Sequence, residues 1–366
     1  MNNKTLKYID LFSGIGGFRK ALELLSDDLN RDIECVAFSE IDKYAVTSYK
    51  ANYNTRNELE IGDIEEFVKD KKNIKELADF DMLFGGFPCQ PFSMMGKQLG
   101  LEDDRGGLFF SVMKIVDIKK PKYILLENVR NLYTHDKGMT YKRLKKELET
   151  HGYNVQEDIL NTSNFGLPQH RRRLYIFATR NDLDSSRITF DSKLIEEHYN
   201  QFTNRSINTY KNVMDGILDI QDVDAKYYLS EKIKPTILSN GTKNFQSNSQ
   251  INQMIARPLT ATMVKMHRAC QDNYYSQEFL DCKCQESYLQ NDFSKDEEAT
   301  HKIRKLTPWE TLKLQGFDKA FFVNSSEAGV SNHQIYKQAG NAVSVNTVYT
   351  VLDYLIQKDE YVLQSS

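Results

Sequence analysis

The stretch "LKYIDLFSGIGGFRKALELL", residues 6–25, combines an apolar run, a glycine-rich segment and a helical pattern. The run from Leu6 to Phe12 is nearly continuous in apolar residues, which is typical of a strand buried on both faces. Gly14 and Gly16 permit a tight turn and a close approach of a ligand to the backbone. The apolar residues that follow have the spacing of one helix face: Phe18, Ala21, Leu22 and Leu25. The stretch therefore predicts a strand–turn–helix unit of an α/β sheet.

Further apolar runs extend this pattern through the first half of the chain. They cover residues 35–38, 82–84, 123–126 and 174–178, with helical patterns between them. Strands that alternate with helices predict a doubly wound sheet of parallel strands. From residue 181 to about 253 the chain is rich in Asn, Ser, Gln and Lys, which indicates a second, irregular domain. Regular patterning returns with a capping box at Thr307, Pro308 and Glu310 and with an apolar helical stripe after Gly340.

Composition narrows the class of protein. The chain has 366 residues, 40% of them hydrophobic and 27% charged, as expected for a globular protein with a sizeable core. No apolar run approaches the roughly 18 residues that span a bilayer, and the N-terminus lacks the apolar core of a signal peptide. Five scattered cysteines do not form a disulfide framework, so we expect a cytoplasmic protein. The net charge of −3 excludes a uniformly basic nucleic-acid binder but leaves room for local basic patches.

Polar residues at the predicted strand ends indicate a cofactor site, because ligands bind at the carboxyl ends of parallel strands. The glycine turn resembles the dinucleotide fingerprint, but Arg19 stands at the third glycine position, which argues against pyrophosphate binding. Glu40 is well placed to accept from ribose hydroxyls, and Asp63 could accept from an exocyclic amine. These residues together suggest a nucleoside cofactor. The alternative is that they are helix caps and surface carboxylates.

A second group of residues suggests covalent chemistry. Cys89 lies in "GGFPCQPFS" (85–93), Glu127 begins "ENV" (127–129), and Arg171 and Arg173 lie in "QHRRRLY" (169–175). Nearby positive charge favours the nucleophilic thiolate, and a carboxylic acid can protonate a heterocycle. If the strands before Cys89 and Glu127 are neighbours, the set suits addition to an electron-poor ring. The alternative interpretation of Cys89 is a buried structural thiol.

Six blocks of sequence resemble the DNA cytosine-5 methyltransferase family in their residues, their order along the chain and their approximate spacing. They are the three blocks just quoted together with "DLFSGIGGF" (10–18), "RKLTPWE" (304–310) and "QAGNAVSV" (338–345). The resemblance implies a class I S-adenosylmethionine-dependent methyltransferase fold, Rossmann-like, with a smaller target-recognition domain. We expect a catalytic and cofactor-binding domain at residues 1–180 and a target-recognition domain at 181–300. A connecting segment would follow at 301–334, and a C-terminal helix at 335–366 would return to the catalytic domain.

The resemblance also implies roles for individual residues. Cys89 would attack carbon 6 of a cytosine flipped out of the duplex, and Glu127 would contact nitrogen 3. Arg171 and Arg173 would hold the base while carbon 5 takes the methyl group of S-adenosylmethionine. The residues expected at the cofactor are Phe12, Gly14, Gly16, Phe18, Glu40, Ile41, Asp63, Ile64, Pro88, Leu108 and Asn341. Ile41 departs from the aromatic residue that some members carry there.

The expected partner is double-stranded DNA. The loop after Pro88 and the segment "ARPLTATMVKMHRACQDNYY" (256–275) would contact it through Gln90, Ser93, Lys97, Arg105, Arg257, Thr260, Thr262 and Arg268. A restriction endonuclease acting on the same site is a plausible companion, and we expect a monomer in a bacterial cytoplasm, associated with the nucleoid through DNA. No metal is expected, although His267, Cys270, Cys282 and Cys284 leave a zinc site conceivable.

Three other functions remain as alternatives. A transfer-RNA cytosine-5 methyltransferase would have a short recognition region, whereas this chain has more than a hundred residues there. A catalytically inactive DNA-binding regulator would have lost the Cys, Glu or Arg residues, all of which are present. A nicotinamide dehydrogenase is disfavoured by Arg19 and leaves Cys89 without a role.

Overall fold

The computed structural model describes residues 5–88, 107–183, 188–201, 205–221, 223–242 and 244–358. The chain divides into two compact units. The first comprises residues 1–161, 172–207 and 343–366, and the second comprises 162–171 and 208–342. Among the described residues, no helix is both long enough and apolar enough to cross a membrane.

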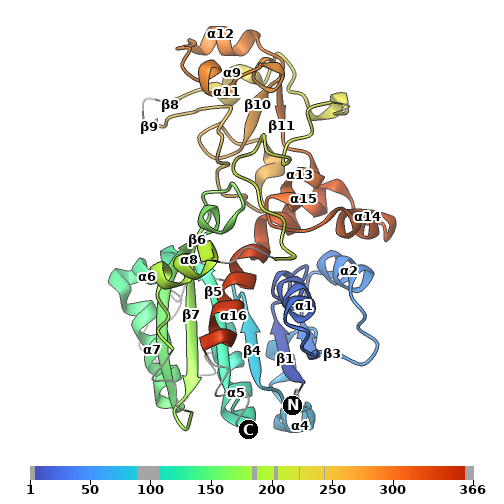
Figure 1. Cartoon of the computed structure of the whole chain (residues 1–366), viewed down its shortest axis with the longest axis vertical. Helices are drawn as coiled ribbons and strands as arrows, with labels where there is room; N and C mark the ends of the chain where they lie inside the picture. Colours follow the sequence, from blue (N-terminus) through green and yellow to red (C-terminus); the bar gives the residue numbers. More distant parts are fainter. Residues whose placement is uncertain are drawn as a thin grey trace. The chain divides into compact units, whose positions relative to one another are not determined.

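The first unit is built on a seven-stranded sheet (Figure 1). Its strands are β1 (Leu6–Leu11), β2 (Ile33–Ser39), β3 (Leu59–Glu60), β4 (Met82–Gly85), β5 (Tyr123–Val129), β6 (Tyr153–Asn161) and β7 (Arg172–Arg180). Its helices are α1 (Gly17–Leu29), α2 (Lys43–Asn52), α3 (Ile64–Phe67), α4 (Lys71–Glu76), α5 (Leu108–Lys119), α6 (Asn131–Thr134), α7 (Met139–Thr150), α8 (Ser192–Gln201) and α16 (Val345–Lys358), with a short 3-10 turn η2 (His135–Gly138).

The strand order is β3-β2-β1-β4-β5-β7-β6. The expected strands and the doubly wound α/β fold are confirmed, and β1 pairs in parallel with both β2 and β4. Strand order reverses between β1 and β4, and such a switch point is where ligands bind in this class of sheet. The five runs therefore place the glycine turn and the segment leading to Cys89 on neighbouring strand ends.

One prediction about the sheet is wrong. We expected the run at 174–178 to form a parallel strand, but β7 runs antiparallel to both β5 and β6. The connection from β6 to β7, residues 162–171, is shorter than the dozen or more residues that a parallel crossover needs. The apolar-run pattern also missed β6, which alternates with polar residues at the edge of the sheet.

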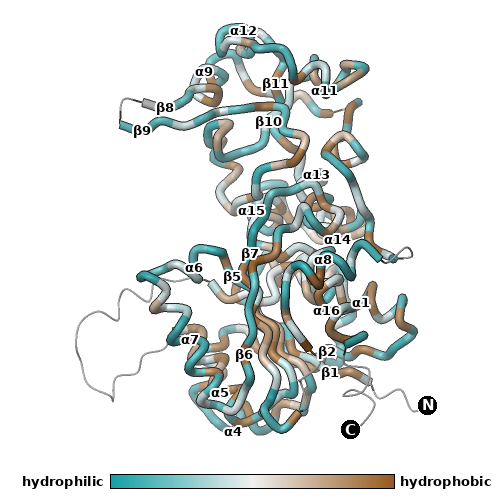
Figure 2. The backbone as a smooth tube through the Cα atoms, turned by 60° about the vertical axis from the view of Figure 1, so that its left-hand side comes forward, coloured by the Kyte–Doolittle hydropathy of each residue, from teal (hydrophilic) through white to brown (hydrophobic). Residues whose placement is uncertain are grey.

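Helices cover both faces of this sheet. One face packs its apolar residues, among them Ile9, Leu83 and Ile124, into a core shared with α3, α4, α5 and α7. On the other face Phe18 of α1 stacks on Phe84 of β4 at 5.2 Å between ring centroids. Figure 2 shows the hydrophobic colour following the strands between these layers. Burial on both faces explains why the strands are continuous apolar runs.

The C-terminal helix α16 closes the first unit. The expected apolar stripe is confirmed, because α16 is buried along most of its length and packs beside α1 (Figure 1). Tyr349 donates a hydrogen bond to the Asp28 carboxylate at the end of α1, at 2.5 Å. A Cβ on Gly17 would lie 2.5 Å from Val343, so α1 and the segment before α16 are in close contact.

The second unit has little sheet. Its helices are α9 (Lys234–Leu238), α10 (Gln277–Asp281), α11 (Gln285–Tyr288), α12 (Lys295–Thr300), α13 (Pro308–Lys313), α14 (Lys319–Glu327) and α15 (Asn332–Asn341), with 3-10 turns η3 (Thr162–Phe165), η4 (Ala225–Tyr227) and η5 (Met263–Lys265). Strand β10 (Tyr274–Ser276) pairs antiparallel with β11 (Ile303–Lys305), and β8 (Gly241–Thr242) pairs with β9 (Phe245–Gln246).

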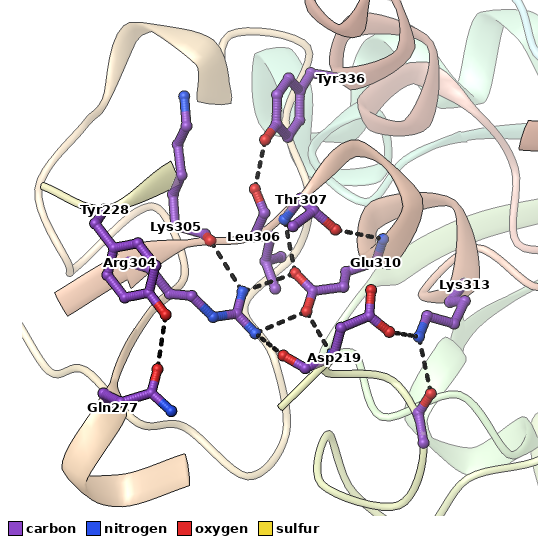
Figure 3. Close-up of polar contacts among 11 residues, drawn as sticks. Asp219, Tyr228, Gln277, Arg304, Lys305, Leu306, Thr307, Glu310, Lys313 and Tyr336 are labelled. Atoms are coloured by element: carbon purple, nitrogen blue, oxygen red, sulfur yellow. Dashed lines mark hydrogen bonds and ion pairs between the residues drawn. The ribbon is translucent and has the colours of Figure 1, made fainter. Parts of the chain in front are cut away.

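The "RKLTPWE" segment organises the second unit (Figure 3). The capping box at the start of α13 is confirmed: Thr307 accepts from the Glu310 amide, and Glu310 accepts from the Thr307 amide. The Glu310 carboxylate also accepts hydrogen bonds from both terminal nitrogens of Arg304, at 2.8 and 2.9 Å. Both side chains are 0% exposed. Asp219 joins them through its backbone amide and carbonyl. The segment 304–310 and the distant residue Asp219 therefore meet at one buried ion pair.

The unit boundaries differ from those expected for three stretches of the chain. Helix α8 lies in the first unit, where it packs on α16 and β6, although the expected target-recognition domain began at residue 181. Residues 162–171 and 301–342 lie in the second unit, since β11 pairs with β10 and α15 packs on α13. Long-range pairing of this kind is not encoded in local composition.

Candidate active site

The carboxyl ends of β1, β2 and β3 are joined by hydrogen bonds. The Ser13 amide donates to the Ser39 carbonyl at 2.9 Å, and the Ser39 hydroxyl donates to the Gly62 carbonyl at 2.8 Å. The Gly14 amide donates to the Glu40 carboxylate at 2.9 Å. The structure thus brings together the glycine turn, Glu40 and the segment before Asp63, which the sequence suggested as one site.

The glycine turn has a special backbone. Gly14 and Gly16 have φ values of +55° and +81°, and Phe12 is held at +56°, which is costly for a residue with a Cβ. A Cβ on Gly14 would meet nothing within 4 Å, so that side of the turn is open. A Cβ on Gly16 would lie 2.5 Å from the Tyr53 ring. The turn is therefore packed against the protein on one side and accessible on the other.

Glu40 is rigidly oriented. Besides the Gly14 amide, its carboxylate accepts from the amides of Ile41 and Asp42, each at 2.8 Å. The Ile41 side chain next to it is 76% exposed, an unusual position for a large aliphatic residue. Asp63 is the N-cap of α3, and its Oδ1 accepts a hydrogen bond from the Glu65 amide. The helix-cap alternative therefore holds for this oxygen.

Two buried polar side chains were missed by the sequence analysis. Both carboxyl oxygens of Asp10 and the Ser13 hydroxyl have no hydrogen-bond partner among the described residues. Asp10 is 0% exposed, and burial raises its pKa to about 8, against a lowering by Arg19. A carboxyl group inside the apolar run "YIDLF" was the signal that could have identified it.

These features match the chemistry of S-adenosylmethionine. Its ribose diol can donate to the oriented Glu40 carboxylate, and its adenine can lie on an exposed apolar side chain such as Ile41. The open side of the Gly14 turn admits a ligand against the backbone, and the unsatisfied polar groups of Asp10 and Ser13 lie in the same strand and turn. The residues present therefore fit a nucleoside cofactor that also carries amino-acid charges.

The second group of residues lies one strand further along. Strands β4 and β5 are hydrogen-bonded neighbours, with Gly85 opposite Leu126, so Glu127 stands beside the end of β4. Arg173 on β7 forms an ion pair with Glu127, with its Nε 3.0 Å from the Glu127 carboxylate. The other Glu127 oxygen lies 3.9 Å from where a Cβ on Gly86 would stand. A carboxyl group and a guanidinium thus meet where the chain leads towards Cys89. Cys89, Gln90, Ser93, Lys97 and Arg105 themselves lie outside the described residues.

Arg171 differs from Arg173. It precedes β7, belongs to the second unit, and donates to the backbone carbonyls of Leu259, Gly340 and Ala342 at 2.8 to 3.1 Å. Arg171 thus lies just outside the regular strand, which begins at Arg172, whereas Arg173 lies within it. Arg171 fastens together three segments of the second unit.

The remaining expected cofactor residues are a mixed set. Phe18 and Ile64 are buried in the first unit, and Leu108 is packed against its core at the start of α5. Pro88 is exposed at the end of the described β4 segment, and Asn341 is exposed at the end of α15 in the second unit.

The segment 256–275 is held by many local bonds. Thr260 and Thr262 have their hydroxyls 3.5 Å apart, and His267 Nε2 lies 3.1 Å from the Thr262 hydroxyl. The Arg257 Nε donates to the Ala269 carbonyl at 2.9 Å, so this guanidinium is partly committed to the fold. Arg268 is half-buried. A Cβ on Gly340 would lie 2.2 Å from the Thr260 backbone, so "QAGNAVSV" needs glycine for a close approach to this segment.

No metal site is formed by the described residues. Among them, no group of three or more His, Cys, Asp or Glu side chains is arranged to hold an ion. The four cysteines described, Cys35, Cys270, Cys282 and Cys284, are free thiols. The zinc alternative therefore gains no support from the described part of the second unit.

Comparison with known proteins places this arrangement in a family. The model of the family described as "C-5 cytosine-specific DNA methylase" matches residues 6–357. The type II methyltransferase M1.ScrFI of Lactococcus lactis subsp. cremoris is 35% identical over 97% of this chain and 80% of its own length. The type II methyltransferase M.HaeII of Haemophilus aegyptius is 34% identical over 96% and 93% of the two chains. The S. pombe Dnmt2 methyltransferase structure is 19% identical, with a TM-score of 0.69 over 96% of this chain and 98% of that one, and it shares the fold. The chain therefore belongs to the C-5 cytosine-specific DNA methylase family, whose members take their methyl group from S-adenosylmethionine.

Proposed function

We propose that the protein methylates carbon 5 of one cytosine within a specific short sequence of duplex DNA, as the modification enzyme of a restriction-modification system. Relatives named type II methyltransferases match it over 80% to 93% of their own length, which supports this assignment. The observation that carries it is the Glu127–Arg173 pair beside the end of β4, four residues before Cys89 in the chain.

In the proposed reaction the Cys89 thiolate forms a bond to carbon 6 of cytosine. Glu127 hydrogen-bonds to nitrogen 3 and stabilises the electron density that the attack pushes into the ring. Carbon 5 then takes the methyl group, with S-adenosylhomocysteine leaving. Loss of the carbon 5 proton to a base and release of Cys89 as thiolate regenerate the enzyme. Arg173 orients the Glu127 carboxyl group through their ion pair at 3.0 Å.

The target base must leave the duplex before Cys89 can reach it, at a cost of a few kcal/mol for unstacking and unpairing. Gln90, Ser93, Lys97 and Arg105 lie within the sixteen residues after Cys89 in the chain. We propose that they contact the DNA. Arg171 is proposed to hold the base together with Arg173; its guanidinium also binds the Leu259 carbonyl next to Thr260.

The cofactor is proposed to lie on the turn formed by Phe12, Gly14, Gly16 and Phe18. Glu40 would accept from its ribose and Ile41 would cover its adenine, with Asp63 and Ile64 nearby. Pro88, Leu108 and Asn341 complete the proposed set. Each of these roles follows from the family resemblance. The three backbone amides that orient the Glu40 carboxylate support the role of Glu40 at the ribose.

Sequence readout is proposed to lie in the second unit, in the segment that carries Thr260, Thr262, Arg257 and Arg268. Exchange of residues 208–342 for those of a relative should move the target sequence. Because Arg171 joins this unit through three carbonyls, residues 162–171 should be exchanged with it. An unchanged target sequence would place readout elsewhere.

Methyl transfer can be measured with labelled S-adenosylmethionine, unmethylated duplex DNA and, in parallel, transfer RNA, with the modified cytosines mapped by bisulfite sequencing. Label at one short repeated DNA sequence is the expected result. Label only on RNA would favour the transfer-RNA alternative, and cofactor binding without transfer would favour an inactive regulator. Cys89→Ala should abolish transfer and leave cofactor binding intact. A companion endonuclease, action as a monomer and a place with the bacterial DNA in the cytoplasm belong to the same proposal.

A further inference from the structure

We infer that Tyr53, held in place by Arg19 and Glu58, is a positioning residue that sets the affinity for S-adenosylmethionine by fixing the glycine turn. The inference rests on the proposed cofactor site at that turn. None of these three residues was expected to act on the cofactor, and Arg19 was noted only as the residue that breaks the dinucleotide fingerprint.

Tyr53 packs directly beneath the turn. Its ring occupies the space next to Gly16, where an added Cβ would lie 2.5 Å from Cε2. Its hydroxyl donates to the Gly16 carbonyl at 2.9 Å and lies 3.4 Å from the Ile15 carbonyl. The Gly16 carbonyl also accepts the first amide bond of α1, from Lys20 at 2.8 Å. Tyr53 therefore holds the residue at which the turn becomes a helix.

Tyr53 is itself held by a cation and its partners. The Arg19 guanidinium lies over the Tyr53 ring at 4.7 Å and over the Tyr49 ring at 5.3 Å from the centroids. Arg19 donates to the Glu58 carboxylate at 2.7 Å, and both side chains of this pair are almost fully buried. It also donates to the Tyr49 hydroxyl and to the Asn54 carbonyl, each at 3.2 Å. A desolvated cation–π contact of this kind is among the stronger ones.

This network reaches the ligand side of the turn through two residues of backbone. Gly16 is two residues from Gly14, whose amide orients Glu40 at 2.9 Å. Both glycines have positive φ, a region that glycine populates about as readily as negative φ, so the turn has little intrinsic preference for one conformation. Without the bond from Tyr53, a larger fraction of molecules would hold the turn in conformations that do not bind the cofactor, and apparent affinity falls in proportion to the competent fraction.

The test is Tyr53→Phe, which removes one hydroxyl and keeps the ring. Tyr153→Phe is the matched control: Tyr153 is buried in the same unit, donates to the Pro121 carbonyl at 2.7 Å, and starts the edge strand β6. Glu58→Gln removes the charge that holds Arg19 without touching Tyr53. Calorimetry gives the dissociation constant for S-adenosylmethionine without DNA, and kinetics give KM for the cofactor and kcat.

We expect Tyr53→Phe to weaken cofactor binding by up to about tenfold and to raise KM by the same factor, with the loss of one hydrogen bond as the upper limit. The value of kcat at saturating cofactor should stay within about twofold, because the reacting groups are untouched. Glu58→Gln should act in the same direction, and Tyr153→Phe should leave cofactor binding unchanged. Fully folded variants with these results would support positioning.

An unchanged dissociation constant in Tyr53→Phe, or equal losses in Tyr53→Phe and Tyr153→Phe that track their melting temperatures, would overturn the inference. A fall in kcat with unchanged KM would overturn it as well. If the wild type binds S-adenosylmethionine but methylates no DNA, only the proposed function fails. If it binds no S-adenosylmethionine, the proposed cofactor site and this inference both fail.

Discussion

The buried ion pair of Arg304 and Glu310 is predicted to stabilise the second unit strongly. The Glu310 carboxylate accepts four bonds, two from Arg304 and one each from the amides of Thr307 and Asp219, at 2.6 to 2.9 Å. Glu310→Gln keeps the shape but turns one oxygen into a donor. Two of the four bonds then become donor–donor contacts, and the guanidinium of Arg304 loses its counter-charge at 0% exposure.

The expected cost is about 3–5 kcal/mol, the range found when one partner of a buried ion pair is removed. At about 2–4 °C per kcal/mol for a domain of 150–250 residues, the melting temperature of the second unit should fall by roughly 6–20 °C. Differential scanning calorimetry measures this shift. Cofactor binding at room temperature should persist, since the proposed cofactor turn lies in the first unit.

The matched control is Glu231→Gln. Glu231 pairs with Lys234 in the same unit at 2.6 Å, and its own side chain is 83% exposed although Lys234 is buried; Lys234 keeps its bond to the Ala299 carbonyl, so the loss should cost clearly less than that of Glu310. A Glu310→Gln protein that melts within about 2 °C of the wild type would refute the reasoning that this pair holds segment 304–310 and Asp219 together.

Three further predictions concern the site. Gly340→Ala puts a methyl group 2.2 Å from the Thr260 backbone, so DNA affinity should fall about tenfold or more; unaltered DNA binding in a mobility-shift titration would remove segment 256–275 from the interface. Arg173→Lys keeps the charge but loses the planar guanidinium beside Glu127, so kcat should fall about 100-fold while cofactor binding is kept; an intact kcat would contradict the pairing. Burial raises the pKa of Asp10 from 3.8 to about 8, so the folded state keeps a proton that the unfolded chain releases, and wild-type stability falls as pH rises from about 4 to 8. Asp10→Asn cannot release a proton and should gain about 1–3 kcal/mol on the wild type between pH 6 and 8.5 in urea unfolding; a pH-independent difference would show that Asp10 is already ionised.

Much of the first unit was predictable because its signals are local. Continuous apolar runs predicted β1, β2, β4, β5 and β7, since strands covered by helices on both faces need no polar side. The capping box of α13 and the stripe of α16 are also short-range patterns. Six ordered motifs predicted the family, because reactive groups and close backbone approaches tolerate few residue types. Gly16, Gly17 and Gly340 are explained in this way by what an added Cβ would meet.

Strand direction, strand pairing and the partners of individual side chains were decided only by the tertiary structure. The run at 174–178 does not encode its antiparallel direction, which follows from the short connection after β6. Arg171 and Arg173 look equivalent in "QHRRRLY", yet one binds three carbonyls in the second unit and the other binds Glu127 in the first. In the sequence, Arg19 is notable only because it replaces a glycine of the dinucleotide fingerprint. Its partners Tyr53 and Glu58 lie more than thirty positions away in the chain. Local sequence determined which elements form and which chemistry they carry, whereas long-range packing decided which side chains meet, because those contacts depend on segments that only the folded chain brings together.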